Sequence, residues 1–149
     1  MTIKQQLLHL CQDFVQNKID VLEATIKSSK EALNSETKSS AGDKHETGRA
    51  MLQLEMEKAG QQLLEVQKMK NQLQRIDLSV TSERVSLGSL VNTNLGRYFI
   101  AISQGQIKVE NKSYFVISSQ SPIGKLLLGK SVNEVVYFRS QEIKIQEIL

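Results

Sequence analysis

The spacing of apolar residues divides the chain near residue 77 into two parts with different periodicity. In residues 47–77 the apolar positions alternate spacings of four and three, which is the pattern of a coiled-coil helix. This stripe comprises Leu52, Met56, Ala59, Leu63, Val66 and Leu73, with Lys70 filling one position. A looser stripe in residues 2–38 comprises Ile3, Leu7, Leu10 and Phe14, and then, one residue out of phase, Val15, Ile19, Leu22, Ile26 and Leu33. Since the connection is short, we predict an antiparallel helical hairpin.

Beyond residue 77 the apolar residues alternate with polar ones, as they do in strands that bury one face. The expected strands are Val85 to Val91, Arg97 to Ile102, Gln106 to Val109, Ser113 to Ile117, Val135 to Phe138 and Ile143 to Ile148. Turn residues separate several of them, at Gln104-Gly105, Glu110-Asn111 and Ser140-Gln141.

One short helix is expected between the fourth and fifth strands. Ser121 suits an N-cap, Pro122 the first helical position, and Gly129 a left-handed position after the helix. The fold class is therefore α+β: a helical hairpin over residues 1–77, then an antiparallel sheet domain with one helix over residues 78–149. Residues 78–84 read as a short hinge between the two.

The composition of the chain indicates where in the cell the protein is expected and argues against a membrane-spanning segment. The 149 residues contain no apolar run of about 18 or more residues, so no association with a membrane is expected. The single cysteine, Cys11, excludes an intramolecular disulfide and favours a reducing, cytoplasmic location, with the thiol in the core. Residues 1–77 carry eleven basic and eleven acidic residues, whereas residues 78–149 carry eight and five, which accounts for the net charge of +3.

The segment that connects the two predicted helices carries two carboxylates, Asp43 and Glu46, after Gly42. In one interpretation Asp43 caps the second helix, Glu46 reaches back to it, and Gly42 closes the first helix. In the other, the two acids lie one turn apart and together hold a divalent cation, whose remaining ligands a partner supplies. A cap would also hold the carboxylates in place, so the two interpretations are compatible.

Basic and polar residues surround this acid pair. Lys38, Lys44 and Arg49 are either solvated charges or contacts to phosphates. His45 is either an acid–base group or, as is more usual for a lone exposed histidine, a residue without a specific role. The serines near the connection are expected to bury little, so that local hydrogen bonds hold this end of the hairpin; they are Ser28, Ser29, Ser35, Ser39 and Ser40.

The chain carries no motif of a catalytic site of its own. It has no Ser/His/Asp spacing, glycine-rich phosphate loop, CxxC pair or HExxH motif, so we expect neither an enzyme, nor a small-molecule substrate, nor a resident cofactor.

Four stretches resemble the Gre-type transcript cleavage factors. Residues 121–130, Ser-Pro-Ile-Gly-Lys-Leu-Leu-Leu-Gly-Lys, resemble the C-terminal signature of that family, as do residues 133–149. Residues 85–91 resemble its opening strand, and Gly42-Asp43-x-x-Glu46 matches the acidic Gly-Asp-x-x-Glu at the end of its coiled coil. The order is also similar: a helical hairpin, an acidic turn, and then an FKBP-like sheet domain.

This resemblance implies a transcription elongation factor that binds RNA polymerase. The C-terminal domain of such factors docks at the rim of the secondary channel, and the coiled coil reaches the active centre. There the acids share a magnesium ion with the polymerase, which cleaves the 3′ end of backtracked RNA. The resemblance assigns the acid role to Asp43 and Glu46 and places Ser121, Pro122, Ile123 and Gly124 on or under the docking surface. The basic residues Lys44 and Arg49 lie beside the acids in the sequence.

The sequence departs from the family after the acid pair. Thr47-Gly48-Arg49-Ala50 stands where the family usually has Asn-Ala-Glu-Tyr. This departure keeps open a second hypothesis, a regulator that occupies the secondary channel without stimulating cleavage. A third hypothesis, a prolyl isomerase or peptide-binding module, rests on analogy of fold alone. The chain has few aromatic residues to line a deep apolar pocket, which argues against it.

Overall fold

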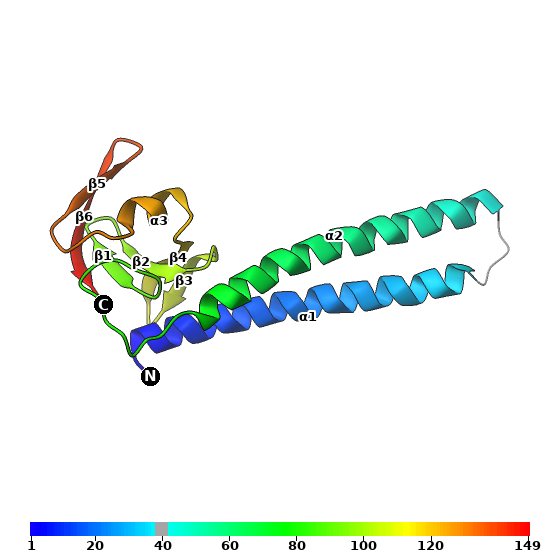
Figure 1. The fold of residues 1–149 in the computed structure, drawn as a ribbon, viewed down its shortest axis with the longest axis horizontal. Coiled ribbons are helices and arrows are strands. Elements are labelled where there is room, and N and C mark those ends of the chain that lie inside the picture. Colours follow the sequence, from blue (N-terminus) through cyan, green and yellow to red (C-terminus); the bar gives the residue numbers. More distant parts are fainter. Residues whose placement is uncertain (38–41) are drawn as a thin grey trace. The chain divides into compact units, whose positions relative to one another are not determined.

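The structure of this chain is a computed structural model that describes residues 1–37 and 42–149, and the side chains of residues 1–35 and 46–149. Two long helices precede a six-stranded sheet and a short third helix (Figure 1), so the expected α+β class is confirmed. The chain divides into two compact units. Unit 1 combines Met1–Phe14 with Asn71–Leu149, and unit 2 is Val15–Lys70.

The two helices are α1, Ile3–Thr37, and α2, Gly42–Gln74. Within unit 2 they run side by side in opposite directions, as the short connection predicts (Figure 1). Each contributes a narrow buried stripe to this unit, with Val15 and Ile19 on α1 and Ala59 and Val66 on α2. Because the two members on each helix lie four or seven residues apart, they face one side of that helix.

Several details of the helical stripes differ from expectation. Leu10 is 37% exposed, and Cys11 takes its place in the buried stripe between Leu7 and Val15. Lys70 is exposed, while Met69 is half-buried, so the lysine lies off the packed face of α2. Ser29 is only 3% exposed, against the expectation that the serines near the connection bury little. Serine is small enough to fit where a helix pair is closely packed, so a polar residue can lie within the stripe.

The sheet of unit 1 has the strand order β3-β4-β2-β1-β6-β5. Its strands are β1, Leu90–Thr93; β2, Arg97–Ala101; β3, Gly105–Val109; β4, Lys112–Ser118; β5, Val135–Phe138; and β6, Gln141–Ile148. All neighbouring pairs are antiparallel except β2 and β4, which run parallel with Tyr98 opposite Phe115. The sheet is therefore mostly antiparallel rather than wholly so, because the β3–β4 hairpin folds back and lays its second strand beside β2.

The turns explain where the strands begin and end. Glu110 and Asn111 both have positive φ, which is the two-residue hairpin geometry expected between β3 and β4. In the β5–β6 hairpin the positive-φ pair is Arg139 and Ser140, one residue before the expected turn. The first strand begins at Leu90 instead of Val85, because Gly88, with a φ of +88°, turns the chain before it.

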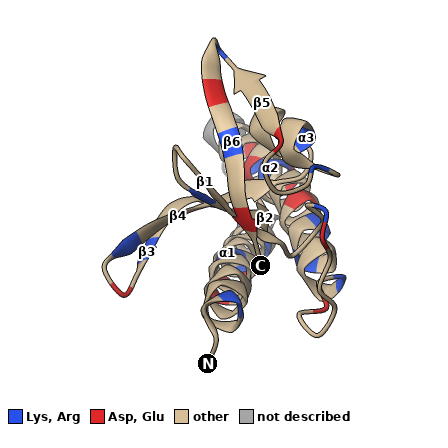
Figure 2. Cartoon of the chain, turned by 90° about the vertical axis from the view of Figure 1, so that its left-hand side faces the viewer, with Lys and Arg blue, Asp and Glu red and all other residues tan. Residues whose placement is uncertain are grey.

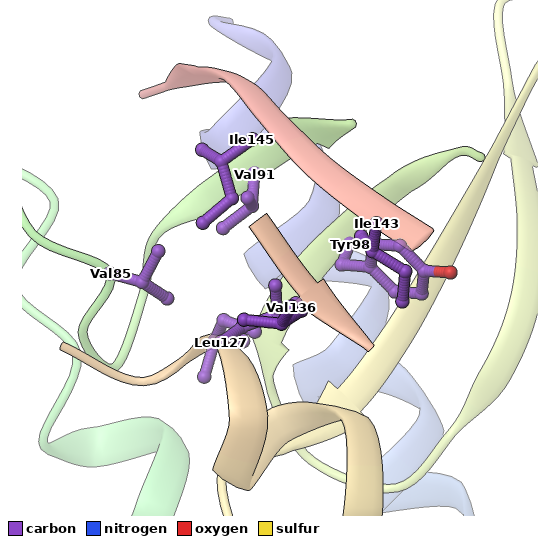
Figure 3. Close-up of a cluster of buried hydrophobic side chains, with 8 residues drawn as sticks. Val85, Val91, Tyr98, Leu127, Val136, Ile143 and Ile145 are labelled. Atoms are coloured by element: carbon purple, nitrogen blue, oxygen red, sulfur yellow. The ribbon is translucent and has the colours of Figure 1, made fainter. Parts of the chain in front are cut away.

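A buried cluster joins the sheet to the third helix, α3, Pro122–Leu127. Val85, Val91, Tyr98, Leu127, Val136, Ile143 and Ile145 meet between the strands and this helix (Figure 3). Leu127 comes from α3 and is fully buried, so this helix closes one face of the sheet. The core thus positions α3, and with it residues 121–124, the second candidate region of the sequence.

Candidate functional site

The acid pair lies in the first turns of α2, which begins at Gly42. Asp43 is thus the second residue of this helix and not its cap, and Gly42 opens α2 instead of closing α1, which ends at Thr37. The capping interpretation is corrected on both points. Acidic residues remain favourable here, because the N-terminal end of a helix carries partial positive charge.

The side chain of Asp43 lies outside the described residues, and that of Glu46 is exposed. Since residues three apart in a helix lie on one face, the backbone of α2 places these two positions as neighbours on its surface. Two neighbouring carboxylates can supply part of the oxygen shell that magnesium requires. Among the described side chains, no group of three or more His, Cys, Asp or Glu residues could hold a metal ion.

The polar neighbours of the pair are only partly described. Lys38 lies outside the described residues, as do the side chains of Lys44 and His45. Arg49 is half-buried on α2, less exposed than a freely solvated charge would be, and Thr47 is exposed. Gly48 lies within the helix, and α2 continues unbroken through it.

The second candidate region, residues 121–124, is held by a hydrogen-bonded cap at the start of α3. The hydroxyl of Ser121 accepts from the Gly124 amide at 3.1 Å and donates to the Ser118 carbonyl at 2.6 Å. Pro122 follows as the first helical residue, and Gly129 has a φ of +80° after the helix. The three features expected of this helix, its cap, its proline and its terminal glycine, are confirmed.

These four residues differ in what they present to a partner. Pro122 is exposed, Ser121 and Ile123 are half-buried, and Gly124 is buried. Ile123 packs against the core cluster, and Gly124 lies so close to Ser118 that a Cβ would meet its carbonyl oxygen. Pro122 can therefore contact a partner directly, whereas Gly124 and Ile123 shape the helix beneath it.

Sequence reasoning did not single out the exposed apolar residues at this end of unit 1. Leu128 follows α3 and is 43% exposed, and Tyr137 on β5 is 67% exposed. The alternation of side chains along β5 could have predicted the exposure of Tyr137. Neighbouring residues of a strand face opposite sides, and Val136 is buried. Lys125 on α3 is exposed as well, so this surface mixes apolar and basic groups.

Charge elsewhere is mixed in sign. Figure 2 shows acidic and basic positions alternating along β6, a strand that contains Glu142, Lys144 and Glu147. The basic excess of residues 78–149 is therefore spread over several elements. Such a surface suits a protein partner better than the continuous basic face that a nucleic acid would need.

Cys11 and His9 take no part in either region. Cys11 is fully buried, and burial raises the pKa of its thiol to about 12, so the thiol stays protonated and inert. His9 lies on an exposed face of α1, 3.6 Å from Asp13. The expectation that Cys11 belongs to the core is confirmed.

The sequence matches no protein-family model and no curated protein. None of the described helices is both long and apolar enough to cross a membrane.

Proposed function

We propose that this protein is a transcription elongation factor that binds RNA polymerase and stimulates the polymerase's own cleavage of backtracked RNA. The observation that carries the proposal is the position of Asp43 and Glu46 in the first turns of α2, next to the connection of the helical hairpin. This position supports a role in which the two acids enter a partner's active centre in the secondary channel.

The geometry of the hairpin supports delivery into a deep site. At about 1.5 Å per residue, a helix of about 30 residues spans about 45 Å. Unit 2 is two helices thick, so it has the narrow form that a channel requires. The helical backbone also fixes the spacing of the two acids, so that their carboxylates can approach a metal ion in one arrangement instead of many.

The role of the acids follows from their chemistry. Asp43 and Glu46 would hold a magnesium ion together with carboxylates and phosphates of the polymerase site, since two protein oxygens alone leave most of its octahedral shell open. When bound, magnesium lowers the pKa of a coordinated water and stabilises charge on a phosphate. Glu46, being exposed, is free to turn toward such a site.

Binding to the rim of the channel is assigned to the surface around α3. Pro122 is exposed at the start of α3 and Leu128 just after its end, and the cap and the buried Gly124 hold this helix firmly. Basic groups such as Lys125 and Lys130 favour an acidic partner surface. The core cluster keeps this surface in place whether or not the hairpin is engaged.

A second candidate function is occupation of the channel without cleavage. Gly48 favours it, because a glycine within the first turns weakens a helix by about 1 kcal/mol and loosens the acid geometry. The family's further acid and aromatic are also absent from residues 47–50. In this case the protein would bind polymerase and leave the RNA intact.

The decisive experiment adds the purified chain to stalled, backtracked elongation complexes with labelled RNA and magnesium. The proposed factor shortens the RNA from its 3′ end. The double variant Asp43→Ala/Glu46→Ala should slow this cleavage by about a hundredfold or more, because even groups that only support metal ligands change activity by about 10–100-fold. Its affinity for polymerase should change little, since exposed carboxylates add affinity only when magnesium bridges them.

The matched control is Glu55→Ala/Glu57→Ala, which removes two exposed acids further along α2. This control should cleave like the native chain. Undiminished cleavage by the Asp43/Glu46 variant would remove the proposal. Tight binding of the native chain without any shortening of the RNA would select the regulator instead.

A further inference from the structure

Unit 1 contains a cavity of about 510 Å³ that takes no part in the proposed function. Residues 2–5, at the start of α1, form one side, Leu78, Ser79 and Thr81 form another, and Leu149 completes it. Its surface is mostly apolar. Its volume lies within the range of about 300–1,000 Å³ that is typical of small-molecule sites.

Lys4 brings the one charged side chain among the residues that line this cavity. It is half-buried, and within the described part of the chain its ammonium group makes neither a hydrogen bond nor an ion pair. Burial lowers the pKa of Lys4. A partly desolvated cation without a partner is a costly arrangement, and an anion would relieve it.

Three other polar residues around the cavity, Thr2, Gln5 and Ser79, already make hydrogen bonds. Thr2 and Gln5 satisfy each other, since the Thr2 amide donates to Gln5 Oε1 at 2.8 Å and the Gln5 amide donates to Thr2 Oγ1 at 3.2 Å. The Ser79 hydroxyl and amide both donate to Asp77 Oδ1. Lys4 is thus left as the group that can recognise a ligand by charge.

We propose that this cavity binds an amphipathic carboxylate, such as a medium-chain fatty acid, with its apolar body against Ile3, Leu78 and Leu149 and its carboxylate on Lys4. A single cation suits one carboxylate, whereas a polyphosphate would require several. An apolar lining suits a hydrocarbon body, whereas a sugar or nucleotide would require more polar groups. This inference does not depend on any activity toward RNA polymerase.

A plainer explanation is that the Lys4 stem only covers apolar surface while its ammonium group reaches water. The two explanations differ in what they predict for added ligands. If Lys4 only covers the surface, no ligand binds with a preference for negative charge. If it recognises a carboxylate, the preference depends on Lys4 and on no other lysine.

The test is calorimetric titration of the full chain with decanoate, decanol and decyltrimethylammonium, the two ions kept below their micellar concentrations and decanol below its solubility limit. Decanoate should bind saturably and more tightly than the other two. Lys4→Met, which keeps the length of the stem and removes the charge, should weaken decanoate binding about tenfold, equal to about 1.4 kcal/mol. The control Lys27→Met changes an exposed lysine of α1 and should leave decanoate binding unchanged.

Amide chemical shifts locate the ligand independently of affinity. On addition of decanoate, the shifts should move for residues 2–5 and 78–81. Shifts confined to another part of the chain would overturn the proposal. So would an absence of saturable binding, equal binding of the three amphiphiles, or decanoate binding that Lys4→Met leaves unchanged while circular dichroism shows the variant to be folded.

Discussion

At the scale of single residues, two glycines that both lie within helices, Gly60 in α2 and Gly124 in α3, differ in their surroundings. A Cβ on Gly124 would meet the Ser118 carbonyl oxygen, a backbone atom that cannot move aside, whereas a Cβ on Gly60 would meet nothing within 4 Å. Gly124→Ala should therefore destabilise the protein by about 1–3 kcal/mol, the typical cost of overpacking. Gly60→Ala should stabilise it by about 0.5–1 kcal/mol, because alanine favours helix.

Urea denaturation followed by circular dichroism measures both changes in the free energy of unfolding. The opposite signs make the comparison sharp, because the substitution is chemically identical. A Gly124→Ala variant as stable as the native chain would mean that the start of α3 can shift, and with it the cap made by Ser121.

At the scale of elements, the buried stripe of α2 decides which positions of the predicted coiled coil matter. Leu73 is 4% exposed, while Lys70, at a neighbouring position of the predicted pattern, is exposed. Leu73→Ala should cost about 2–5 kcal/mol of stability, since it removes packed methylene groups and leaves a cavity. Lys70→Ala should change stability by no more than about 0.5 kcal/mol.

Thermal and urea unfolding of the two variants test this assignment. If Lys70→Ala lowered the free energy of unfolding as much as Leu73→Ala, the aliphatic part of Lys70 would be packed in the buried stripe, as the heptad pattern alone predicts. Met69, which is half-buried, would then not be the residue that fills this level of the helix.

At the scale of the whole molecule, the compact units do not follow the change in sequence pattern near residue 77. Unit 1 takes in Met1–Phe14 and Asn71–Gln74 from the ends of the helices as well as the sheet. Just beyond α2, Ile76 lies against Gly88, close enough that a Cβ on this glycine would stand 2.9 Å from Ile76 Cγ2. Residues 78–149 alone would lack these contacts.

A variant that replaces residues 15–70 with a short glycine-rich linker keeps all of unit 1. It should fold, bind RNA polymerase and compete with the full chain, but it should not stimulate cleavage, because Asp43 and Glu46 are gone. Competition binding and the RNA cleavage assay measure the two properties separately. A peptide of residues 15–70 that binds polymerase as tightly as the full chain would contradict this division of roles.

Local pattern alone was enough to predict most of the elements. The stripes of α1 and α2, five of the six strands and the capped α3 all follow from contacts between residues near in sequence, which periodicity and capping residues record. The positions of Asp43 and Glu46 near the start of α2 could be predicted for the same reason, although their place relative to the helix cap could not. A residue or two at a helix end depends on surroundings that a pattern does not contain.

What the tertiary structure decided involves residues that are distant in the chain. The parallel pairing of β2 with β4, the turn at Gly88 packed on Ile76, and the burial of Ser29 depend on which surfaces meet. The cavity beside Lys4 is formed by three segments that are distant in the chain, so no local sequence pattern predicts it. Periodicity reports which face of an element is apolar, and only the packed chain determines what covers that face and what it leaves open.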